Sequence, residues 1–457
     1  MSDNLSFGTS GLRGLAADFT DARVAGWVGR FVALTGARTL MIGRDLRASS
    51  PAIARSVADA AVGCGCAVTD CGVLPTPALA LEAMRRKAAA VMVTGSHIPA
   101  DRNGLKFYTA SGELTKAEEA ALAACAPASP AAGGSAGTDS GGALAAYRDR
   151  YVAHRAAFDL AGLHVGVDEH SSVARDLLPE VLEALGARVT RRGRSAEFVP
   201  VDTEAVGDAQ REQARRWAAG HRLDALVSTD GDADRPLVAD ETGAYLRGDL
   251  VGLATAAFLG ADVVATPVTS SSAPELSSLF SKILRTRVGS PFVIEAMAAH
   301  GGTVVGYEAN GGVLLGSPAV LGDGALAALP TRDAMLPILA VLATARRQGL
   351  RVSQLESLFP RRFTRSDRLT GVDREGWSRV ASSLDTLPPA LAAAGQMERI
   401  DRADGVRLVF AGGDGIHFRA SGNAPELRCY SEAGTAEEAD RLLALGLAHA
   451  RAVLGRG

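Results

Sequence analysis

Two segments that lie far apart in the sequence carry the residue types needed for group transfer at a metal ion. The first follows the apolar run 88–93 and holds Ser96, with His97 beside it and Lys106 a short distance downstream. A serine hydroxyl is a weak nucleophile at neutral pH and needs a base or a cation close by. His97 and Lys106 are the local candidates. We therefore expect Ser96 to be a nucleophile aimed at a ligand.

The second segment follows another apolar run and places Asp230, Asp232 and Asp234 at alternate positions, directly before Arg235. Three carboxylates form a hard, oxygen-only ligand set, which suits Mg²⁺. A calcium-binding EF-hand loop is the alternative, because Glu241 stands twelfth when counted from Asp230. Arg235 in place of the loop glycine, and a strand rather than a helix before the loop, oppose it. Together with the serine, this site indicates phosphoryl transfer.

Three further segments carry groups that bind anions or hydroxyls. The segment 419–428 combines two arginines with a hydroxyl, an amide and a flexible glycine turn. Arginine forks pair with phosphate oxygens, and turn amides add donors. The glycine-rich segment 7–14, with Arg13, also resembles a loop that approaches phosphate. Glu308 and Asn310 offer hydrogen bonds to sugar hydroxyls. Read alone, each segment also fits an ordinary surface loop or turn.

Composition and charge narrow the class of protein. A chain of 457 residues with 47% hydrophobic and 22% charged residues predicts two to four globular domains. The net charge of −3 gives no electrostatic case for binding nucleic acid or a membrane surface. Five cysteines without zinc-site spacing fit a reducing compartment, where we expect them to be packing residues. The first residues have neither a basic start nor an apolar core, and we expect a cytoplasmic protein.

The elements that must position these groups repeat three times. In each repeat a short apolar run leads through a polar turn into a helix-like segment. These opening runs are 39–42, 163–167 and 263–265. Each repeat later reaches another apolar strand that ends in one of the loops described above. These later runs are 88–93, 223–227 and 303–305. Because ligands of open α/β sheets gather beyond the carboxyl ends of strands, we expect the three loops to converge on one cleft.

The remaining sequence separates the repeats and closes the chain. The segment 126–142 is rich in Ala, Gly, Ser and Pro, which predicts a linker. From about Phe363 the pattern changes to a helix, a hairpin that turns at 412–415, and a final helix over 436–454. We predict three α/β domains of similar topology around a cleft and a C-terminal α+β domain. The expected boundaries are 1–142, 143–250, 251–362 and 363–457.

Taken in order, these segments resemble the α-D-phosphohexomutase family, which includes phosphomannomutases, phosphoglucomutases and phosphoglucosamine mutases. The resemblance covers essentially the whole chain. It is carried by the Thr-x-Ser-His serine loop, the Asp-x-Asp-x-Asp-Arg metal loop, the Gly-x-Glu-x-x-Gly sugar loop and the Arg-x-Ser-Gly phosphate loop. We refer to these four loops by these names below.

Membership of the family implies a mechanism and a role for each loop. Ser96 would carry a phosphoryl group, and Mg²⁺ would bridge that group and the three aspartates. Arg13, Lys106 and Arg235 would sit near the transferring group. Glu308 and Asn310 would bind sugar hydroxyls. The non-reacting phosphate would be held by Arg419, Ser421, Asn423 and Arg428. The phosphoserine would give its phosphoryl to a hexose monophosphate, and the bisphosphate would turn around and return the other phosphoryl.

The chain departs from the commoner family pattern mainly where sugar or phosphate is recognised. Ile98 replaces asparagine, Ala233 stands where glycine is also common, Asn310 and Gly312 replace serine and histidine, Asn423 and Ala424 replace threonine and glutamate, and Arg287 and Ser290 replace lysine and histidine. These departures bear on the choice of hexose more than on the chemistry. We expect a phosphomannomutase that uses a hexose 1,6-bisphosphate as activator, with glucose and glucosamine phosphates as alternative substrates.

Two other classes of function remain open from the sequence. A metal-dependent phosphatase would use the same serine and metal but release inorganic phosphate. A non-catalytic sugar-phosphate-binding protein would bind the ligand without phosphorylation of Ser96. The presence of Ser96, the three aspartates and Arg419 together argues against the non-catalytic protein.

Overall fold

The computed structural model describes residues 5–8, 10–322, 324–420 and 426–455. The chain divides into two compact units. The first unit comprises Met1–Ala265 and Gly289–Leu355, and the second comprises Thr266–Val288 and Glu356–Gly457. Among the described residues, no helix combines the length and the hydropathy that a bilayer crossing requires.

The first sheet of unit 1 is built around a buried parallel pair. Its strand order is β1-β2-β6-β5-β3-β4-β8, and β7 pairs with β6. The strands are β1 Ser6–Phe7, β2 Leu12–Leu15, β3 Thr39–Arg44, β4 Ala67–Val73, β5 Ala89–Val93, β6 Arg102–Thr109, β7 Gly112–Glu113 and β8 Ser135–Thr138. Strands β3 and β5 run parallel, and β6 returns antiparallel to β5. The loop between β5 and β6 is the serine loop.

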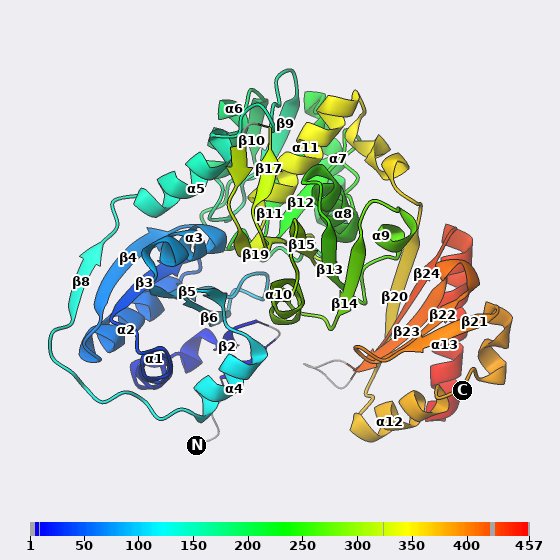
Figure 1. Cartoon of the computed structure of the whole chain (residues 1–457), viewed down its shortest axis with the longest axis horizontal. Helices are drawn as coiled ribbons and strands as arrows, with labels where there is room; N and C mark the ends of the chain where they lie inside the picture. Colours follow the sequence, from blue (N-terminus) through cyan, green and yellow to red (C-terminus); the bar gives the residue numbers. More distant parts are fainter. Residues whose placement is uncertain (1–4, 9, 323, 421–425, 456–457) are drawn as a thin grey trace. The chain divides into compact units, whose positions relative to one another are not determined.

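Helices cover both faces of this sheet, which explains its continuous apolar strands. The helices are α1 Asp21–Thr35, α2 Ser50–Gly63, α3 Thr76–Arg86 and α4 Lys116–Ala124. Ile42 and Val91 pack into one core with residues of α1 and α2. Gly43 faces the other way, where a Cβ would lie 3.2 Å from a methyl of Leu79 in α3. Figure 1 shows α3 on the side of the sheet opposite to α1 and α2.

The expected linker over 126–142 contains a strand. Residues of β8 pair in parallel with β4 at the edge of the sheet. Every side chain of β8 is exposed, so its sequence lacks the apolar alternation that marks a strand. The predicted linker therefore includes a four-residue strand that the sequence did not indicate, because backbone hydrogen bonds to the existing edge order these residues without apolar side chains.

The second sheet repeats the arrangement of the first. Its order is β10-β9-β11-β12, with three parallel strands and an antiparallel return strand. The strands are β9 His164–Asp168, β10 Arg188–Arg192, β11 Ala225–Thr229 and β12 Pro236–Ala239. The helices are α5 Gly142–Val152, α6 Leu177–Ala184 and α7 Asp208–His221. The metal loop joins β11 to β12.

The third sheet follows the same plan in its consecutive strands β13-β15-β16-β19, which are part of the five-stranded order β14-β13-β15-β16-β19, where β14 is Lys282–Thr286. The strands are β13 Val263–Pro267, β15 Val304–Tyr307, β16 Val313–Leu315 and β19 Leu329–Asp333, beside the hairpin of β17 Ala319–Leu321 and β18 Gly324–Leu326. The helices are α8 Gly248–Phe258, α10 Ser290–Ala298 and α11 Met335–Gln348. Strands β13 and β15 are parallel, and β16 returns antiparallel. The sugar loop joins β15 to β16.

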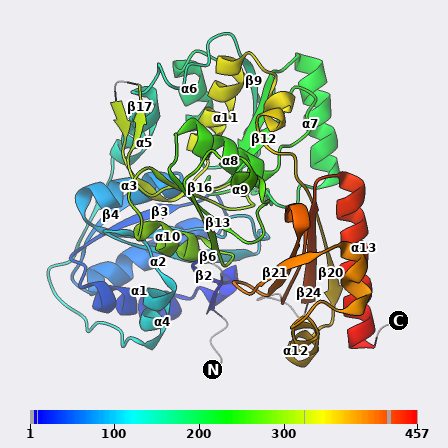
Figure 2. The same cartoon turned by 45° about the vertical axis from the view of Figure 1, so that its right-hand side comes forward.

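Unit 2 contains an antiparallel sheet of order β20-β24-β23-β22-β21. Its elements are α9 Ala273–Leu276, β14 Lys282–Thr286, β20 Phe363–Thr370, α12 Arg374–Ser383, β21 Met397–Asp401, β22 Val406–Phe410, β23 Gly415–Ala420, β24 Glu426–Ala433 and α13 Ala436–Leu454. Helix α13 packs on this sheet (Figure 2), where Gly446 lets the helix approach Cys429. The predicted final helix and hairpin are confirmed.

Short 3-10 helices complete the fold at Ala16–Asp18, Val352–Leu358, Pro389–Ala394 and Ala411–Gly413. The five cysteines are free, and Cys66 and Cys429 are buried in the cores of the two units. The fold as a whole is the predicted one, with three α/β sheets of similar topology and an α+β C-terminal part.

Candidate active site

The serine loop is held in one conformation by a buried ion pair. Ser96 is fully buried and has a positive φ of 52°, an uncommon conformation for a residue with a side chain. Its backbone N–H donates to Thr94 Oγ1 at 2.8 Å, and Thr94 donates to Asp45 at 2.8 Å. Arg47, paired with Asp45 at 3.1 Å, donates to the carbonyl oxygen of Ser96 at 2.9 Å. The loop therefore presents the Ser96 hydroxyl on a fixed backbone.

Asp45 and Arg47 were not among the predicted site residues. They lie in a polar segment after β3, and the sequence gives no sign that this segment reaches the serine loop. A glycine is required beside Ser96, because a Cβ at Gly95 would lie 2.6 Å from the guanidinium carbon of Arg47. The close approach of Arg47 thus explains the glycine in the serine loop.

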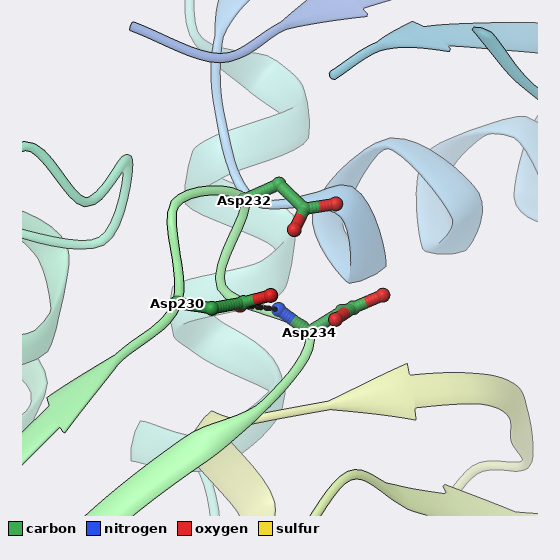
Figure 3. A group of neighbouring side chains, drawn as sticks. All are labelled: Asp230, Asp232 and Asp234. Atoms are coloured by element: carbon green, nitrogen blue, oxygen red, sulfur yellow. Dashed lines mark hydrogen bonds between the residues drawn. The ribbon is translucent and has the colours of Figure 1, made fainter. Parts of the chain in front are cut away.

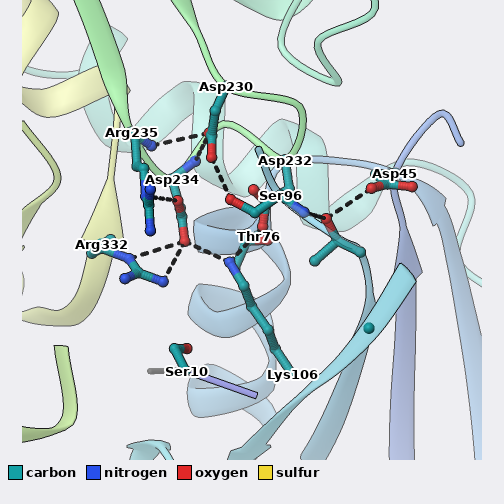
Figure 4. A network of polar contacts seen from close by, with 12 residues as sticks. Ser10, Asp45, Thr76, Ser96, Lys106, Asp230, Asp232, Asp234, Arg235 and Arg332 are labelled. Carbon is teal, nitrogen blue, oxygen red and sulfur yellow. Dashed lines mark hydrogen bonds and ion pairs between the residues drawn. The ribbon is translucent and has the colours of Figure 1, made fainter. Parts of the chain in front are cut away.

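The structure brings the serine loop and the metal loop together. The Ser96 hydroxyl donates to Oδ2 of Asp230 at 2.6 Å and lies 3.3 Å from Nδ1 of His97. Thr76, at the start of α3, donates through its hydroxyl to Asp232 at 2.6 Å and through its backbone N–H to the Asp232 carbonyl at 2.9 Å. Figure 4 shows these contacts from the first repeat to the second.

The three aspartates of the metal loop offer carboxylate oxygens that lie within 4.8 Å of one another (Figure 3). Oδ1 of Asp230 accepts the backbone N–H groups of Asp234 and Arg235, each at 3.2 Å. Among the described residues, neither Oδ1 of Asp232 nor Oδ1 of Asp234 has a hydrogen-bond partner, although both are buried. Buried carboxylate oxygens are costly without a partner. The donor set therefore fits a hard divalent cation.

The EF-hand alternative is wrong. The carboxylate of Glu241 accepts the hydroxyl and the backbone N–H of Ser353, the latter at 3.2 Å. Glu241 follows β12 and lies outside the cluster of aspartates.

Among the described residues, Lys106, Arg235 and Arg332 form ion pairs with the aspartates. Lys106 donates to Asp232 and to Asp234 at 2.6 Å each. Burial alone would lower the pKa of Lys106, but the two carboxylates outweigh burial and raise it. Arg332 pairs with Asp234 at 2.8 Å, and Arg235 lies 3.7 Å from the same residue. Burial raises the pKa of Asp234, but these cations outweigh it and hold that pKa below its ordinary value.

The nearby charges also shift the pKa values of Asp230, His97 and Arg13. Burial, followed by the neighbouring carboxylates Asp232 and Asp234, raises the pKa of Asp230 well above its ordinary value. Burial and the nearby Arg235 and Arg13 lower the pKa of His97 to about 2, so its imidazole is neutral. Burial, Arg235 and Arg332 lower the pKa of Arg13 to about 10. The positive side chains of the site lie close enough to repel one another, and this repulsion lowers the pKa values of His97 and Arg13. Such a concentration of positive charge is expected where a multiply charged anion binds.

The sugar loop lies beside the metal loop through Arg332. This arginine donates to Glu308 at 3.2 Å as well as to Asp234. Nδ2 of Asn310 lies 3.5 Å from Glu308, whereas Oδ1 of Asn310 accepts the backbone N–H of Gly312 at 2.9 Å. Asn310 therefore orders its own loop in addition to facing Glu308. Arg332 is a site residue that the sequence motifs did not indicate, because it lies within β19, outside all four loops.

The remaining predicted residues belong to unit 2. Arg419 on β23 and Arg428 on β24 are direct cross-strand partners, so their side chains share one face of the sheet. Arg419 pairs with Asp404 at 3.0 Å. Like charges placed opposite each other destabilise a sheet, which favours an anionic ligand at this face. Ser421, Asn423 and the departure at Ala424 lie outside the described residues, as does Thr9 of the glycine-rich segment.

One departure from the family pattern has a visible substitute contact. Ser290, which stands where histidine is usual, donates to Glu113 at 3.1 Å. Ser10, from the glycine-rich segment, donates to the same carboxylate. These contacts join the first and third repeats within unit 1 without a histidine.

Comparison with known protein families matches four consecutive segments of the chain to four domains of one family. Residues 4–130, 147–243 and 248–362 match the phosphoglucomutase/phosphomannomutase alpha/beta/alpha domains I, II and III, and residues 377–445 match the C-terminal domain of the same family. The matches follow one another in the order of the three sheets and the C-terminal part.

Two curated relatives are similar over nearly their whole length. A phosphomannomutase of Sinorhizobium fredii is 44% identical over 97% of this chain and 98% of its own. A phosphomannomutase of Salmonella muenchen is 41% identical over 99% of this chain and 97% of its own. The crystal structure of a putative phosphomannomutase from Thermus thermophilus shares the fold, with a TM-score of 0.75, 24% identity and complete coverage of both chains. The chain belongs to the phosphoglucomutase/phosphomannomutase family, the α-D-phosphohexomutases.

Proposed function

We propose that this chain is a phosphomannomutase, which moves a phosphoryl group between C1 and C6 of a hexose phosphate through a phosphoserine and a bisphosphate intermediate. The observation that carries the proposal is the hydrogen bond of 2.6 Å between the Ser96 hydroxyl and Asp230, inside a buried cluster of carboxylates and cations. A nucleophile held against an acidic, metal-compatible cluster suits phosphoryl transfer. The names of the two curated relatives support mannose phosphate as substrate.

We infer that Ser96, Asp230, Asp232 and Asp234 hold Mg²⁺. The support is the oxygen-only donor set and the two buried Oδ1 atoms that lack a partner among the described residues. When bound, the ion supplies positive charge that stabilises the transferring phosphoryl group. Lys106 and Arg332 already engage the Oδ2 atom of Asp234, and this fixes the carboxylate with Oδ1 left over.

The proposed reaction follows from these positions. The bond between phosphorus and Oγ of phospho-Ser96 breaks while a sugar hydroxyl forms a new bond to the same phosphorus; the hydroxyl loses one proton and the leaving Oγ takes up one, so that Ser96 ends as a neutral hydroxyl. The hexose bisphosphate then turns around, and its other phosphoryl group returns to Oγ. Lys106, Arg13 and Arg235 stabilise the negative charge of the transferring group. The fixed serine loop supplies orientation, since positioning accounts for much of phosphoryl-transfer catalysis.

Recognition of the substrate is assigned to two loops. We propose that Glu308 and Asn310 bind the sugar hydroxyls, and that Arg419, Ser421, Asn423 and Arg428 hold the non-reacting phosphate. Support for the phosphate role comes from the cross-strand pairing of the two arginines. The proposed domains are 1–142, 143–250, 251–362 and 363–457, and a hexose 1,6-bisphosphate is the proposed activator. Glucose and glucosamine phosphates remain the alternative substrates.

The test is a direct assay with competing substrates. Mannose 1-phosphate, glucose 1-phosphate and glucosamine 1-phosphate are incubated separately with the protein, Mg²⁺ and the matching bisphosphate, and phosphorus NMR follows both the isomer and inorganic phosphate. We expect the 6-phosphate to form fastest from mannose 1-phosphate. Release of inorganic phosphate without an isomer would instead identify a phosphatase.

The Ser96→Ala variant separates catalysis from binding. We expect it to lose turnover almost completely and to take up no phosphoryl group from the bisphosphate, as measured by intact mass spectrometry. Ser111→Ala is the matched control, because Ser111 is exposed and lies at a turn between β6 and β7. A wild-type protein that binds the sugar phosphate but never becomes phosphorylated would be the non-catalytic binding protein.

A further inference from the structure

Arg332 is the residue that connects the metal loop to the sugar loop. It is only 2% exposed, yet its guanidinium makes two separate charge-assisted contacts. Nε and Nη2 donate to Oδ2 of Asp234 at 3.0 and 2.8 Å, and Nη1 donates to Oε2 of Glu308 at 3.2 Å. The planar fork of an arginine fixes the directions of both carboxylates at once, which a lysine cannot do.

The space for this side chain exists because Gly312 has no side chain. The register of β16 with β19 pairs Val313 with Asp333, so Gly312, which directly precedes β16, lies close to the end of β19 that carries Arg332. A Cβ at Gly312 would lie 2.9 Å from Cδ and 3.0 Å from Cγ of Arg332, closer than such carbons approach one another. These atoms are the middle of a buried side chain, which cannot move aside without breaking its contacts with Asp234 and Glu308.

We propose that Arg332 is a positioning residue of the phosphoryl transfer, and that Gly312 and Arg332 act as a pair. The inference deepens the proposed function and rests on it. Arg332 orients Glu308 as an acceptor for a sugar hydroxyl and orients Asp234 as a metal ligand. The sugar and the transferring phosphoryl group are thereby held in a fixed position relative to each other. A side chain at position 312 would occupy the space of Arg332 and uncouple the two loops.

A purely structural role for Arg332 makes a different prediction. A buried ion pair that only supports the fold affects stability, and its loss changes activity only as far as the protein unfolds. A positioning role lowers kcat in protein that remains folded, since the reacting groups lose alignment. Arg332→Lys separates the two, because it keeps the charge but loses the fork.

The experiment is a double-mutant cycle with Arg332→Ala, Gly312→Ala and the variant that carries both, beside Arg332→Lys. Arg346→Met, an exposed arginine on α11, is the control for loss of one surface charge. We expect Arg332→Ala to lower kcat by about 10²-fold, as for the loss of one preorganised donor, and Arg332→Lys to lower it by at least about tenfold with an unchanged unfolding midpoint. Gly312→Ala should lower kcat alone and have no further effect in the Arg332→Ala background.

A second readout does not depend on turnover. In the Ser96→Ala background, calorimetric titration with mannose 1-phosphate should show at least about fivefold weaker binding when Arg332→Ala is added, since Glu308 loses its fixed direction. The inference is overturned if the losses from Arg332→Ala and Gly312→Ala multiply, or if Arg332→Lys keeps wild-type kcat. A wild-type protein that isomerises none of the three sugar phosphates would instead refute the proposed function, and the titration would still test the pair.

Discussion

At the scale of single residues, the oxygens of the aspartate cluster are divided between two tasks. Oδ2 of Asp232 and of Asp234 accepts hydrogen bonds from Lys106 at 2.6 Å. The corresponding Oδ1 atoms have no hydrogen-bond partner within the described part of the chain. One buried lysine thus neutralises part of the acidic cluster through the Oδ2 atoms and leaves the Oδ1 atoms without a hydrogen bond, although Oδ1 of Asp234 also lies 3.7 Å from Nε of Arg235.

Replacing Lys106 by methionine should therefore destabilise unit 1. Removal of one partner from a buried charge cluster leaves carboxylates without compensation, which costs about 3–5 kcal/mol. Hydrogen exchange of peptides from β6 and β11 measures the loss, and Mg²⁺ should restore protection more in the variant than in the wild type. Lys87→Met, on an exposed lysine, is the control. Equal protection of Lys106→Met and wild type without Mg²⁺ would contradict the prediction.

Arg428 belongs to the proposed phosphate loop rather than to the aspartate cluster. We expect Arg428→Ala to lower kcat/KM by about 10²- to 10³-fold, by analogy with the loss of one charge-stabilising donor. Steady-state kinetics with mannose 1-phosphate measures the effect, with Arg374→Ala, on α12 of the same unit, as the control. Losses that are mild and equal in Arg428→Ala and Ser96→Ala would count against both assigned roles.

At the scale of elements, one arrangement of two strands and a loop recurs in all three sheets of unit 1. In each sheet a parallel strand is followed by an antiparallel return strand, and a functional loop joins the two. The pairs are β5 with β6, β11 with β12, and β15 with β16. Such a loop begins at the carboxyl end of a buried strand and must turn tightly. Its side chains therefore lie at the edge where ligands of α/β sheets bind.

The elements are also joined by a buried carboxylate beside Arg332. Asp333 accepts the hydroxyls of Tyr147, at 2.6 Å, and of Tyr151, both on α5, and it accepts the backbone N–H of Met335 at the start of α11 at 2.8 Å. Asp333 thus ties a helix of the second repeat to the third. Tyr151→Phe should cost about 1–3 kcal/mol, because a buried acceptor loses its donor.

Hydrogen exchange of α5 and α11 peptides measures this effect. Tyr430→Phe, in unit 2, should leave exchange in α5 and α11 unchanged. Unaltered protection of α5 and α11 in Tyr151→Phe would show that the contact with Asp333 does not hold these helices together.

At the scale of the whole molecule, the two units have separate cores, so unfolding need not follow a single transition. Unit 2 contains a histidine that is buried in the neutral form. Burial lowers the pKa of His417 to about 4, while the contact with the carbonyl of Asp404 opposes the shift. His417 also stacks on Tyr430.

This histidine predicts a pH dependence of the stability of unit 2. The folded pKa of His417 lies below the ordinary value of 6.5, so the unfolded state binds the proton first. Stability should be fully present above about pH 6.5 and fall by about 3 kcal/mol as the pH drops toward 4. Hydrogen exchange of β23 peptides between pH 7 and 4.5, corrected for intrinsic rates, measures the fall. His417→Gln should remove this part of the pH dependence, and an unchanged profile in that variant would contradict the assignment.

Sequence patterns alone determined the local features of this protein. The alternation of apolar runs with polar turns predicted β3, β5, β9, β11, β13 and β15, and the three-residue and four-residue spacing predicted α6. Motif spacing also selected Ser96, the three aspartates and Glu308. These predictions succeed because periodicity and turn chemistry depend on residues that are close in sequence. The edge strand β8 was missed because its exposed residues carry no such periodicity.

Only the tertiary structure decided which distant residues share the site. Arg47 reaches Ser96 across 49 sequence positions, and Arg332 reaches Asp234 across 98. An isolated arginine looks the same in sequence whether it faces solvent or a buried carboxylate, because its partner is supplied by strand register and loop closure. The room for Arg332 depends on the missing side chain of Gly312 in a neighbouring strand connection. Packing between repeats therefore decided the charge balance of the site, which no local pattern encodes.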